Sequence, residues 1–100
     1  MDIAKLMEQA QRMQADMQAA QESLAGQTVT GTAGGGVVTV EADGQGAVKK
    51  VTIDPSVVDP GDVAMLEDLV TVAVADAQRR AAELQQSEMG RVTGGLQLPF

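Results

Sequence analysis

The pattern of apolar and polar positions divides the chain into two helical segments with a β-rich segment between them. In residues 2–25 the apolar positions recur at intervals of three and four, at Ile3, Leu6, Ala10, Met13, Met17, Ala20 and Leu24. This heptad spacing predicts a helix with a narrow apolar seam, which is typical of a contact between two helices. The alternative is that the stripe packs on the sheet of its own domain. Asp2 and Gly26 are residues suited to begin and end this helix.

Three short strands are predicted in the middle of the chain, over residues 27–33, 37–42 and 47–53. The glycine-rich sequences "GGG" and "DGQG" between them are typical of tight turns. In the second strand Val38 and Val40 share one face, as expected for a half-buried strand. A three-stranded antiparallel sheet of this kind has two exposed edges, which favours pairing with a second copy.

A second helix is predicted from Asp62, which is a suitable N-cap, to about Glu88. Its apolar positions are Leu66, Leu69, Val70, Ala73, Ala77, Ala81 and Leu84. Residues 70–75 alternate like a strand, but the strong helix formers on both sides favour a helix. The β-branched residues there cover most of the helix surface, so we expect deep burial. Residues 90–100 contain glycine and proline and are expected to form a flexible tail after a single domain of residues 1–89.

The composition limits the core and the chemistry. The chain has 100 residues, no Cys or His, and one aromatic residue, Phe100. So small a chain without aromatic residues has little apolar surface to bury, which favours an obligate homodimer. The lack of Cys and His argues against disulfides, a metal site and imidazole chemistry, and no cofactor is expected. The N-terminus lacks a secretory signal and the longest apolar run is too short to cross a membrane, so we expect a cytoplasmic protein.

No group of residues has the pattern of an active site. The carboxylate pairs Glu67/Asp68 and Asp59/Asp62 lie around a helix start, where acidic residues favour the helix dipole. The glycine-rich residues 31–36 are not followed by the Lys-Ser/Thr of a P-loop, and they lead into a strand. We therefore expect neither an enzyme nor a small-molecule substrate.

The net charge of −7 by itself argues against nucleic-acid binding, so the placement of the seven basic residues matters. Lys5 and Arg12 are seven residues apart and share one face of the first helix, outside the seam. Arg79 and Arg80 lie late in the second helix, and Arg91 begins the predicted tail. They are either solubilising charges, with the two adjacent arginines paired to Asp76 or Glu83 by helical spacing, or the edge of a groove between two copies.

Along essentially its whole length the sequence resembles the YbaB/EbfC family of bacterial nucleoid-associated proteins. The matching stretches are "LMEQAQRMQADMQ" (6–18), "VTGTAGGGVVTV" (29–40), "VTIDPSVV" (51–58), "MLEDLVTVAVADAQRR" (65–80) and "GGLQLPF" (94–100). The resemblance implies an α+β, α-β-β-β-α subunit with long flanking helices, in an intertwined homodimer with projecting helical arms. It also implies a cytoplasmic, nucleoid protein that binds double-stranded DNA largely without sequence specificity and contributes to chromosome compaction, protection or gene regulation.

On this reading the expected DNA contacts are Lys5, Arg12, Arg79, Arg80 and Arg91. The expected dimer interface comprises Ile3, Leu6, Ala10, Met13, Met17, Leu24, Leu69 and Val70. Relatives in the family carry lysines near the positions of Glu8 and Asp16, so DNA binding here should be weaker and strongly salt-dependent. The alternative function is that of an adaptor that docks partner helices through the methionine-rich first helix.

Overall fold

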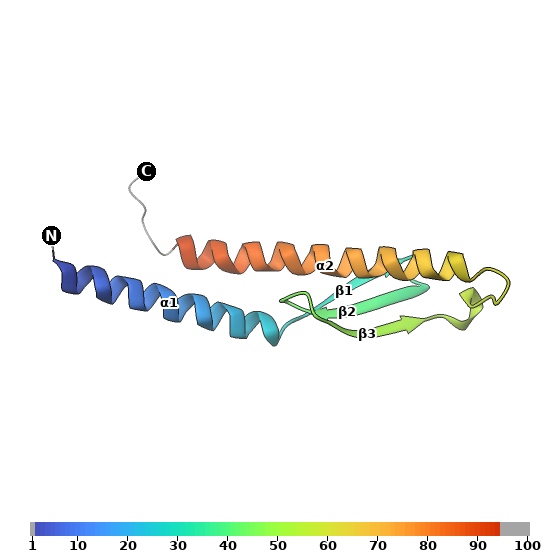
Figure 1. Cartoon of the computed structure of the whole chain (residues 1–100), viewed down its shortest axis with the longest axis horizontal. Helices are drawn as coiled ribbons and strands as arrows, with labels where there is room; N and C mark the ends of the chain where they lie inside the picture. The colour runs from blue at the N-terminus through green and yellow to red at the C-terminus, as the bar shows by residue number, and fades with distance from the viewer. Residues whose placement is uncertain (1, 95–100) are drawn as a thin grey trace.

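The computed structural model describes residues 2–94, which form two long helices and one three-stranded sheet (Figure 1). In chain order the elements are helix α1 (Ile3–Ala25), strands β1 (Thr28–Ala33), β2 (Val38–Asp43) and β3 (Val48–Ile53), the 3-10 turn η1 (Pro55–Val57) and helix α2 (Val63–Gly94). This order confirms the predicted α-β-β-β-α subunit. It also confirms that residues 70–75 are helical.

Aspartates begin both helices, as the sequence predicted. Oδ1 of Asp2 accepts hydrogen bonds from the N–H groups of Ala4 and Lys5 at 3.1 and 3.4 Å. Oδ1 of Asp62 accepts one from the N–H group of Met65 at 3.2 Å. Each carboxylate thereby satisfies N–H groups that have no partner within the helix.

The second helix is longer than predicted. Its expected end at Glu88 was wrong, because α2 continues to Gly94 and includes Arg91. Gly90 does not end the helix, since a single glycine in a helix interior costs only about 1 kcal/mol relative to alanine. The other residues of the predicted flexible tail, 95–100, lie outside the described residues, so their flexibility stays a prediction.

The strands pair in the order β1-β2-β3 and all pairs are antiparallel. Val40 in the central strand lies opposite Gly31 of β1. A bulge opposite Glu41 and Ala42 leaves Lys49 as the extra residue of β3. Both outer strands are edges of the sheet, as predicted.

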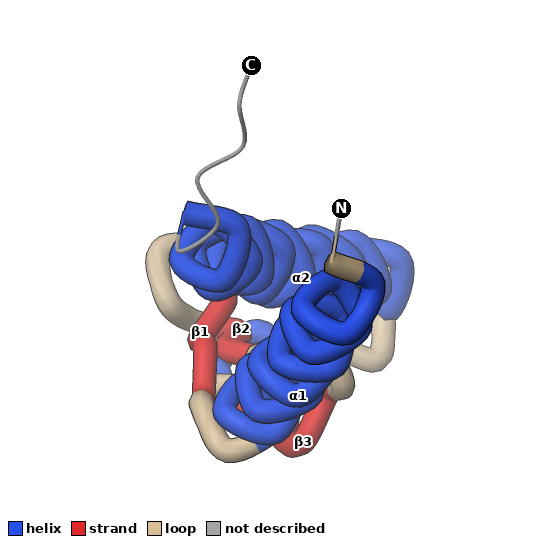
Figure 2. The backbone as a smooth tube through the Cα atoms, turned by 90° about the vertical axis from the view of Figure 1, so that its left-hand side faces the viewer, coloured by secondary structure: helices blue, strands red, loops and turns tan. Residues whose placement is uncertain are grey.

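Helix α2 packs on the face of the sheet formed by β1 and β2 and makes a shallow core (Figure 2). Among the described residues the buried apolar ones are Ala20, Leu24, Ala33, Val38, Val40, Ala42, Ala73, Ala77 and Ala81. Six of these nine are alanines. The deep burial predicted for residues 70–75 was wrong for the single chain. Only Ala73 is buried there, Val70 and Val74 are half-buried against the core, and Val72 is 56% exposed.

Helix α2 meets β1 backbone to backbone. A Cβ atom on Gly31 would lie 2.2 Å from the nitrogen of Ala77 and 2.4 Å from the carbonyl oxygen of Ala73. The next residue of the strand, Thr32, donates its N–H to Oδ2 of Asp76 at 3.0 Å. The close approach therefore brings an acidic side chain of α2 onto the outer edge of β1.

Helix α1 projects from the sheet beside the C-terminal half of α2 (Figures 1 and 2). We call these two segments the helical arm. Of the residues in α1, only Ala20 and Leu24 are buried, and Ile3 at its free end is 69% exposed. The apolar stripe of α1 therefore does not cover the sheet of its own chain, which excludes that interpretation of the heptad pattern.

Candidate nucleic-acid interface

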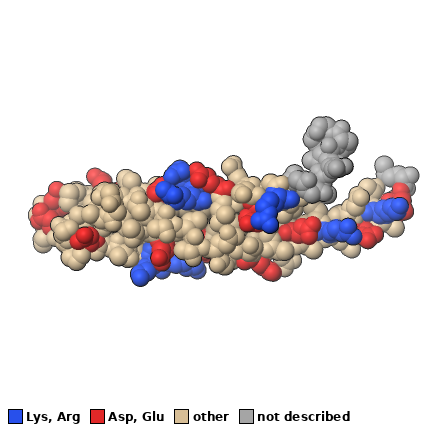
Figure 3. All heavy atoms as spheres, turned by 180° about the vertical axis from the view of Figure 1, so that it is seen from behind, with Lys and Arg blue, Asp and Glu red and all other residues tan. Residues whose placement is uncertain are grey.

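The basic residues of the chain lie on three elements. Lys5 and Arg12 are on α1, Lys49 and Lys50 are on β3, and the other three are on α2. Between Lys50 and Arg79 the chain has no basic residue, but it has the acidic residues Asp54, Asp59, Asp62, Glu67, Asp68 and Asp76. On the face seen in Figure 3, basic side chains lie over the middle of the molecule and the arm, and none lies at the opposite end. A polyanion is therefore repelled from the end that carries η1 and the start of α2.

Five of the seven basic residues form ion pairs within the chain. On α1, Arg12 lies 3.7 Å from Glu8, and both side chains are largely exposed. Among residues 2–94, Lys5 and Lys50 have no carboxylate within ion-pair distance. Because an exposed pair contributes only about 0–1 kcal/mol, a DNA phosphate can compete for Arg12. The free lysines and Arg12 are the basic side chains most open to an incoming phosphate.

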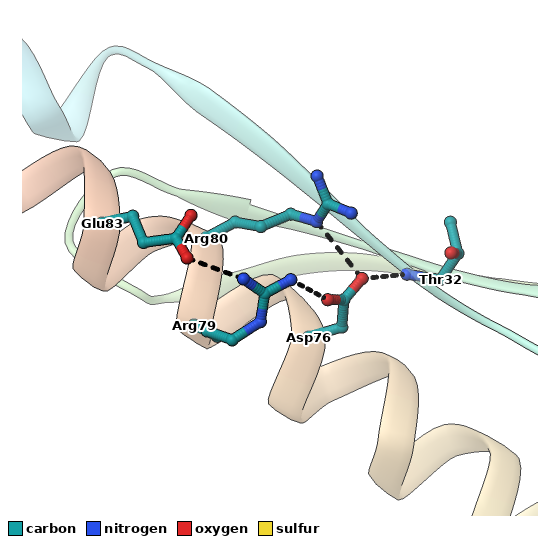
Figure 4. A network of polar contacts seen from close by, with 5 residues as sticks. All are labelled: Thr32, Asp76, Arg79, Arg80 and Glu83. Atoms are coloured by element: carbon teal, nitrogen blue, oxygen red, sulfur yellow. Dashed lines mark hydrogen bonds and ion pairs between the residues drawn. The ribbon is translucent and has the colours of Figure 1, made fainter.

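A polar network joins α2 to β1 through Asp76 (Figure 4). Its carboxylate accepts hydrogen bonds from Arg79 at 2.8 Å and from Arg80 at 3.2 Å, in addition to the Thr32 N–H. Arg79 also donates to Glu83 at 2.7 Å. These contacts confirm the pairing that the helical spacing suggested.

Hydrogen bonding lowers the pKa of Asp76 to about 2, first through the N–H of Thr32 and then through Arg79. The bond to Asp76 in turn raises the pKa of Arg79. Asp76 therefore stays ionised at any pH near neutrality. The two arginines, Asp76 and Glu83 together carry no net charge, so this part of α2 is not a strong cationic patch.

Arg91 lies on the helical arm and not in a tail. It pairs with Glu88 at 3.3 Å. The same carboxylate accepts a hydrogen bond from Gln27, which follows α1, at 3.4 Å. An open cleft where the two helices of the arm meet is lined by Asp16, Ala19, Ala20, Ser23, Glu88, Arg91 and Val92. Arg91 thus lies beside α1, whereas Lys5 lies near its free end, and the single chain does not gather the predicted DNA contacts into one patch.

The residues predicted for the dimer interface fall into two groups. Ile3, Leu6, Ala10, Met13 and Met17 are exposed on α1 and are free to meet a second copy. Leu24 is fully buried in its own chain, where its carbonyl oxygen accepts the N–H of Gly44. Leu69 and Val70 are half-buried against the sheet of their own chain. The interface itself stays a prediction.

Three features of this surface were not found from the sequence. They are the approach of α2 to Gly31, the bond between Thr32 and Asp76, and the unpaired state of Lys50. The sequence places Asp76 three and four residues before two arginines, which indicates their pairing on the helix but not the bond to Thr32. The contact with β1 joins residues 44 apart in the chain and has no local pattern.

Within the part of the chain that the structure describes, no helix is long and apolar enough to cross a membrane. The same residues contain no cluster of three or more His, Cys, Asp or Glu side chains that could hold a metal ion.

The fold defines a class of small, elongated α-β-β-β-α proteins with a helical arm. A solved member of this class is the crystal structure of the uncharacterized protein HP0035 from Helicobacter pylori. It superimposes with a TM-score of 0.82, covers 94% of this chain and 99% of its own, and is 22% identical in sequence. This likeness establishes the shared fold.

The chain belongs to the YbaB/EbfC DNA-binding family, which it matches over residues 1–96. A nucleoid-associated protein of Gemmatimonas aurantiaca is 49% identical over 100 residues, covering 100% of this chain and 96% of the relative. A nucleoid-associated protein of Saccharopolyspora erythraea is 53% identical over 95 residues, covering 95% of this chain and 82% of the relative. The family suggested by the sequence motifs is thereby confirmed.

Proposed function

We propose that this protein binds double-stranded DNA as a homodimer, largely without sequence specificity, and is associated with the nucleoid in the cytoplasm. It would contribute to chromosome compaction, protection or gene regulation by binding rather than by catalysis. The observation that carries the proposal is the match to the DNA-binding family over residues 1–96. The placement of the basic residues supports the proposal. They lie on the arm and on the middle of the molecule, whereas the end that carries η1 and the start of α2 has acidic residues and no basic ones.

The small core supports a homodimer. Among the described residues, only Leu24, Val38 and Val40 are large side chains that are fully buried. Large apolar side chains remain exposed on α1, on β3 and on the first half of α2, as at Met17, Val51 and Val72. A chain of this size has a thin margin of stability, and a second copy would cover such surface.

The basic residues favour binding to the DNA backbone over reading of bases. Phosphate contacts hold a protein on the duplex but carry no sequence information directly, whereas sequence is read through base edges and DNA shape. On the arm we propose contacts from Lys5, Arg12 and Arg91, and on the middle of α2 from the Arg79–Arg80 pair. The acidic end would be turned away from the duplex.

The test is a titration of long duplex DNA by gel shift, with the solution mass measured alongside. We expect retardation at micromolar dimer and low salt. If a dimer neutralises about three phosphates, the slope of log affinity against log salt should be near −3. The double variant Arg79→Ala/Arg80→Ala should bind more weakly with a shallower slope. Absence of retardation at about 50 mM salt would contradict DNA binding, since non-specific affinity is then near its highest.

The second candidate function is that of a protein–protein adaptor, which the exposed methionines of α1 favour. Met7 is 59% exposed, and Met13 and Met17 are exposed on the same helix. Flexible, polarizable methionine side chains suit surfaces that adapt to different partners. Capture of a helical partner that persists after nuclease treatment, and that is lost on Met13→Gln/Met17→Gln, would favour this function over DNA binding.

A further inference from the structure

The two adjacent arginines of α2 have different hydrogen-bond partners. Both terminal nitrogens of Arg79 are occupied, NH1 by Glu83 at 2.7 Å and NH2 by Asp76 at 2.8 Å. Arg80 donates only through Nε, to Asp76 at 3.2 Å. Its two terminal nitrogens have no hydrogen-bond partner among residues 2–94, and in Figure 4 the dashed line from Arg80 to Asp76 starts at Nε alone. From the sequence the two arginines were equivalent, but in the structure only Arg79 has partners at its terminal nitrogens.

Asp76 is a fixed partner and not a mobile one. Its side chain is only 19% exposed, and Oδ2 accepts the Thr32 N–H and the Arg80 Nε–H at the same time. A phosphate that displaced Asp76 would leave the N–H of Thr32 without its partner at the edge of β1. Glu83, in contrast, is 62% exposed, and within residues 2–94 it pairs with Arg79 alone.

A guanidinium group binds phosphate best through two parallel N–H donors. The Arg80 side chain is 50% exposed and offers its terminal donors without breaking any bond in the chain. Arg79 must first release a carboxylate from a short, charge-assisted hydrogen bond. Arg80 also lines an open depression between β1 and α2, together with Val29, Thr30, Glu83 and Leu84.

We propose that Arg80 is the arginine of this pair that binds DNA phosphate, and that Glu83 keeps Arg79 from doing so. This inference rests on the proposed function in DNA binding. Glu83 is then a built-in competitor that sets how many phosphates each subunit neutralises. In this network the affinity for DNA is limited by the pairing of the arginines as well as by their number.

The first test compares two variants with the same loss of charge, Arg80→Gln and Arg79→Gln, by gel shift across a salt series. Arg80→Gln should lower the affinity by about tenfold and reduce the salt slope by about 1 per subunit. Arg79→Gln should change the affinity by less than about twofold and leave the slope nearly unchanged, because it contacts no phosphate. Circular dichroism checks that both variants are folded.

The second test removes the competitor. Glu83→Gln should raise the affinity by about threefold or more and steepen the slope by about 1 per subunit, because the neutral amide holds Arg79 less tightly than phosphate does. The matched control is Glu67→Gln, which changes the net charge equally on the same helix, about 24 Å from Glu83. It should have little effect at a salt concentration where the Debye length is about 10 Å. In the Glu83→Gln background, Arg79→Gln should then lower the affinity.

Equal losses for Arg79→Gln and Arg80→Gln would overturn this inference and leave the proposed function intact. Equal gains for Glu83→Gln and Glu67→Gln would do the same, since net charge alone would then explain them. A wild-type protein that does not retard DNA would overturn the proposed function and this inference together. The salt slope separates a lost phosphate contact from a change in the structure alone.

Discussion

At the scale of single residues, Gly31 decides how closely α2 approaches the sheet. No side chain fits between this residue and the backbone of Ala77, so the strand and the helix can touch only where β1 has a glycine. The contact places Asp76 beside Thr32, and Asp76 in turn orients both arginines. A residue without a side chain therefore determines the geometry of the charged network.

Gly31→Ala should destabilise the fold by about 3 kcal/mol or more, because the added methyl group meets backbone atoms that cannot move aside independently. Urea denaturation followed by circular dichroism measures this change. The matched control is Gly90→Ala, where the added Cβ would meet no atom of another described element within 4 Å. In the helix interior it should stabilise by about 0.5–1 kcal/mol. An equal, small effect of both substitutions would contradict the tight packing at Gly31.

At the scale of elements, α1 and α2 use their apolar residues differently. The alanine face of α2 allows close packing on the sheet and accounts for much of the core. The stripe of α1 has larger side chains, but from Ile3 to Met17 it packs on no element of its own chain tightly enough to be buried. A helix with an exposed seam of this kind is stabilised when a partner covers it.

If the seam of α1 forms the dimer, Met13→Lys should raise the dimer dissociation constant by about tenfold or more, because an unpaired charge would be buried at the contact. Sedimentation equilibrium measures the constant. Gln11→Lys is the matched control, since it adds the same charge on the opposite face of the helix and should have no comparable effect. If Met13→Lys leaves the dimer dissociation constant unchanged, the interface must lie on another exposed apolar surface, such as β3 and the first half of α2.

At the scale of the whole molecule, the single chain is too extended to be a typical independent domain. It measures 70 × 25 × 16 Å and has a radius of gyration of 19.5 Å. A compact domain of this length would have a radius of gyration of about 13 Å. The helical arm lengthens the surface that can lie along a DNA duplex. It also leaves the chain with little internal packing. In the proposed homodimer, stability and DNA contact would both depend on how the two copies assemble.

An obligate dimer predicts that thermal stability depends on protein concentration. Diluting the protein tenfold should lower Tm by about 3 °C, because unfolding is then coupled to dissociation. Calorimetry at several concentrations, with the mass measured under the same conditions, tests this expectation. A folded monomer with a Tm independent of concentration would contradict the homodimer, whatever its affinity for DNA.

The sequence by itself determined the elements of this protein and their order. Heptad spacing, glycine-rich turns and aspartate caps are local signals, because each depends on residues a few positions apart. The helical assignment of residues 70–75 and the caps at Asp2 and Asp62 were therefore predictable. The family came from the order of several motifs along the chain, and the pairing of Asp76 with the arginines came from helical spacing.

Only the tertiary structure decided which surfaces of those elements are covered. The predicted burial of Val72 failed because α2 presents alanines to the sheet, and a helical pattern does not show how wide the packed face is. Leu24 belongs to the core of its own chain because a turn of the sheet packs on the end of α1. Thr32, which lies far away in the sequence, donates to Asp76, and in the folded chain Asp76 accepts a hydrogen bond from a terminal nitrogen of Arg79 but only from Nε of Arg80. Such choices depend on contacts between distant segments, and these form only when the chain has folded.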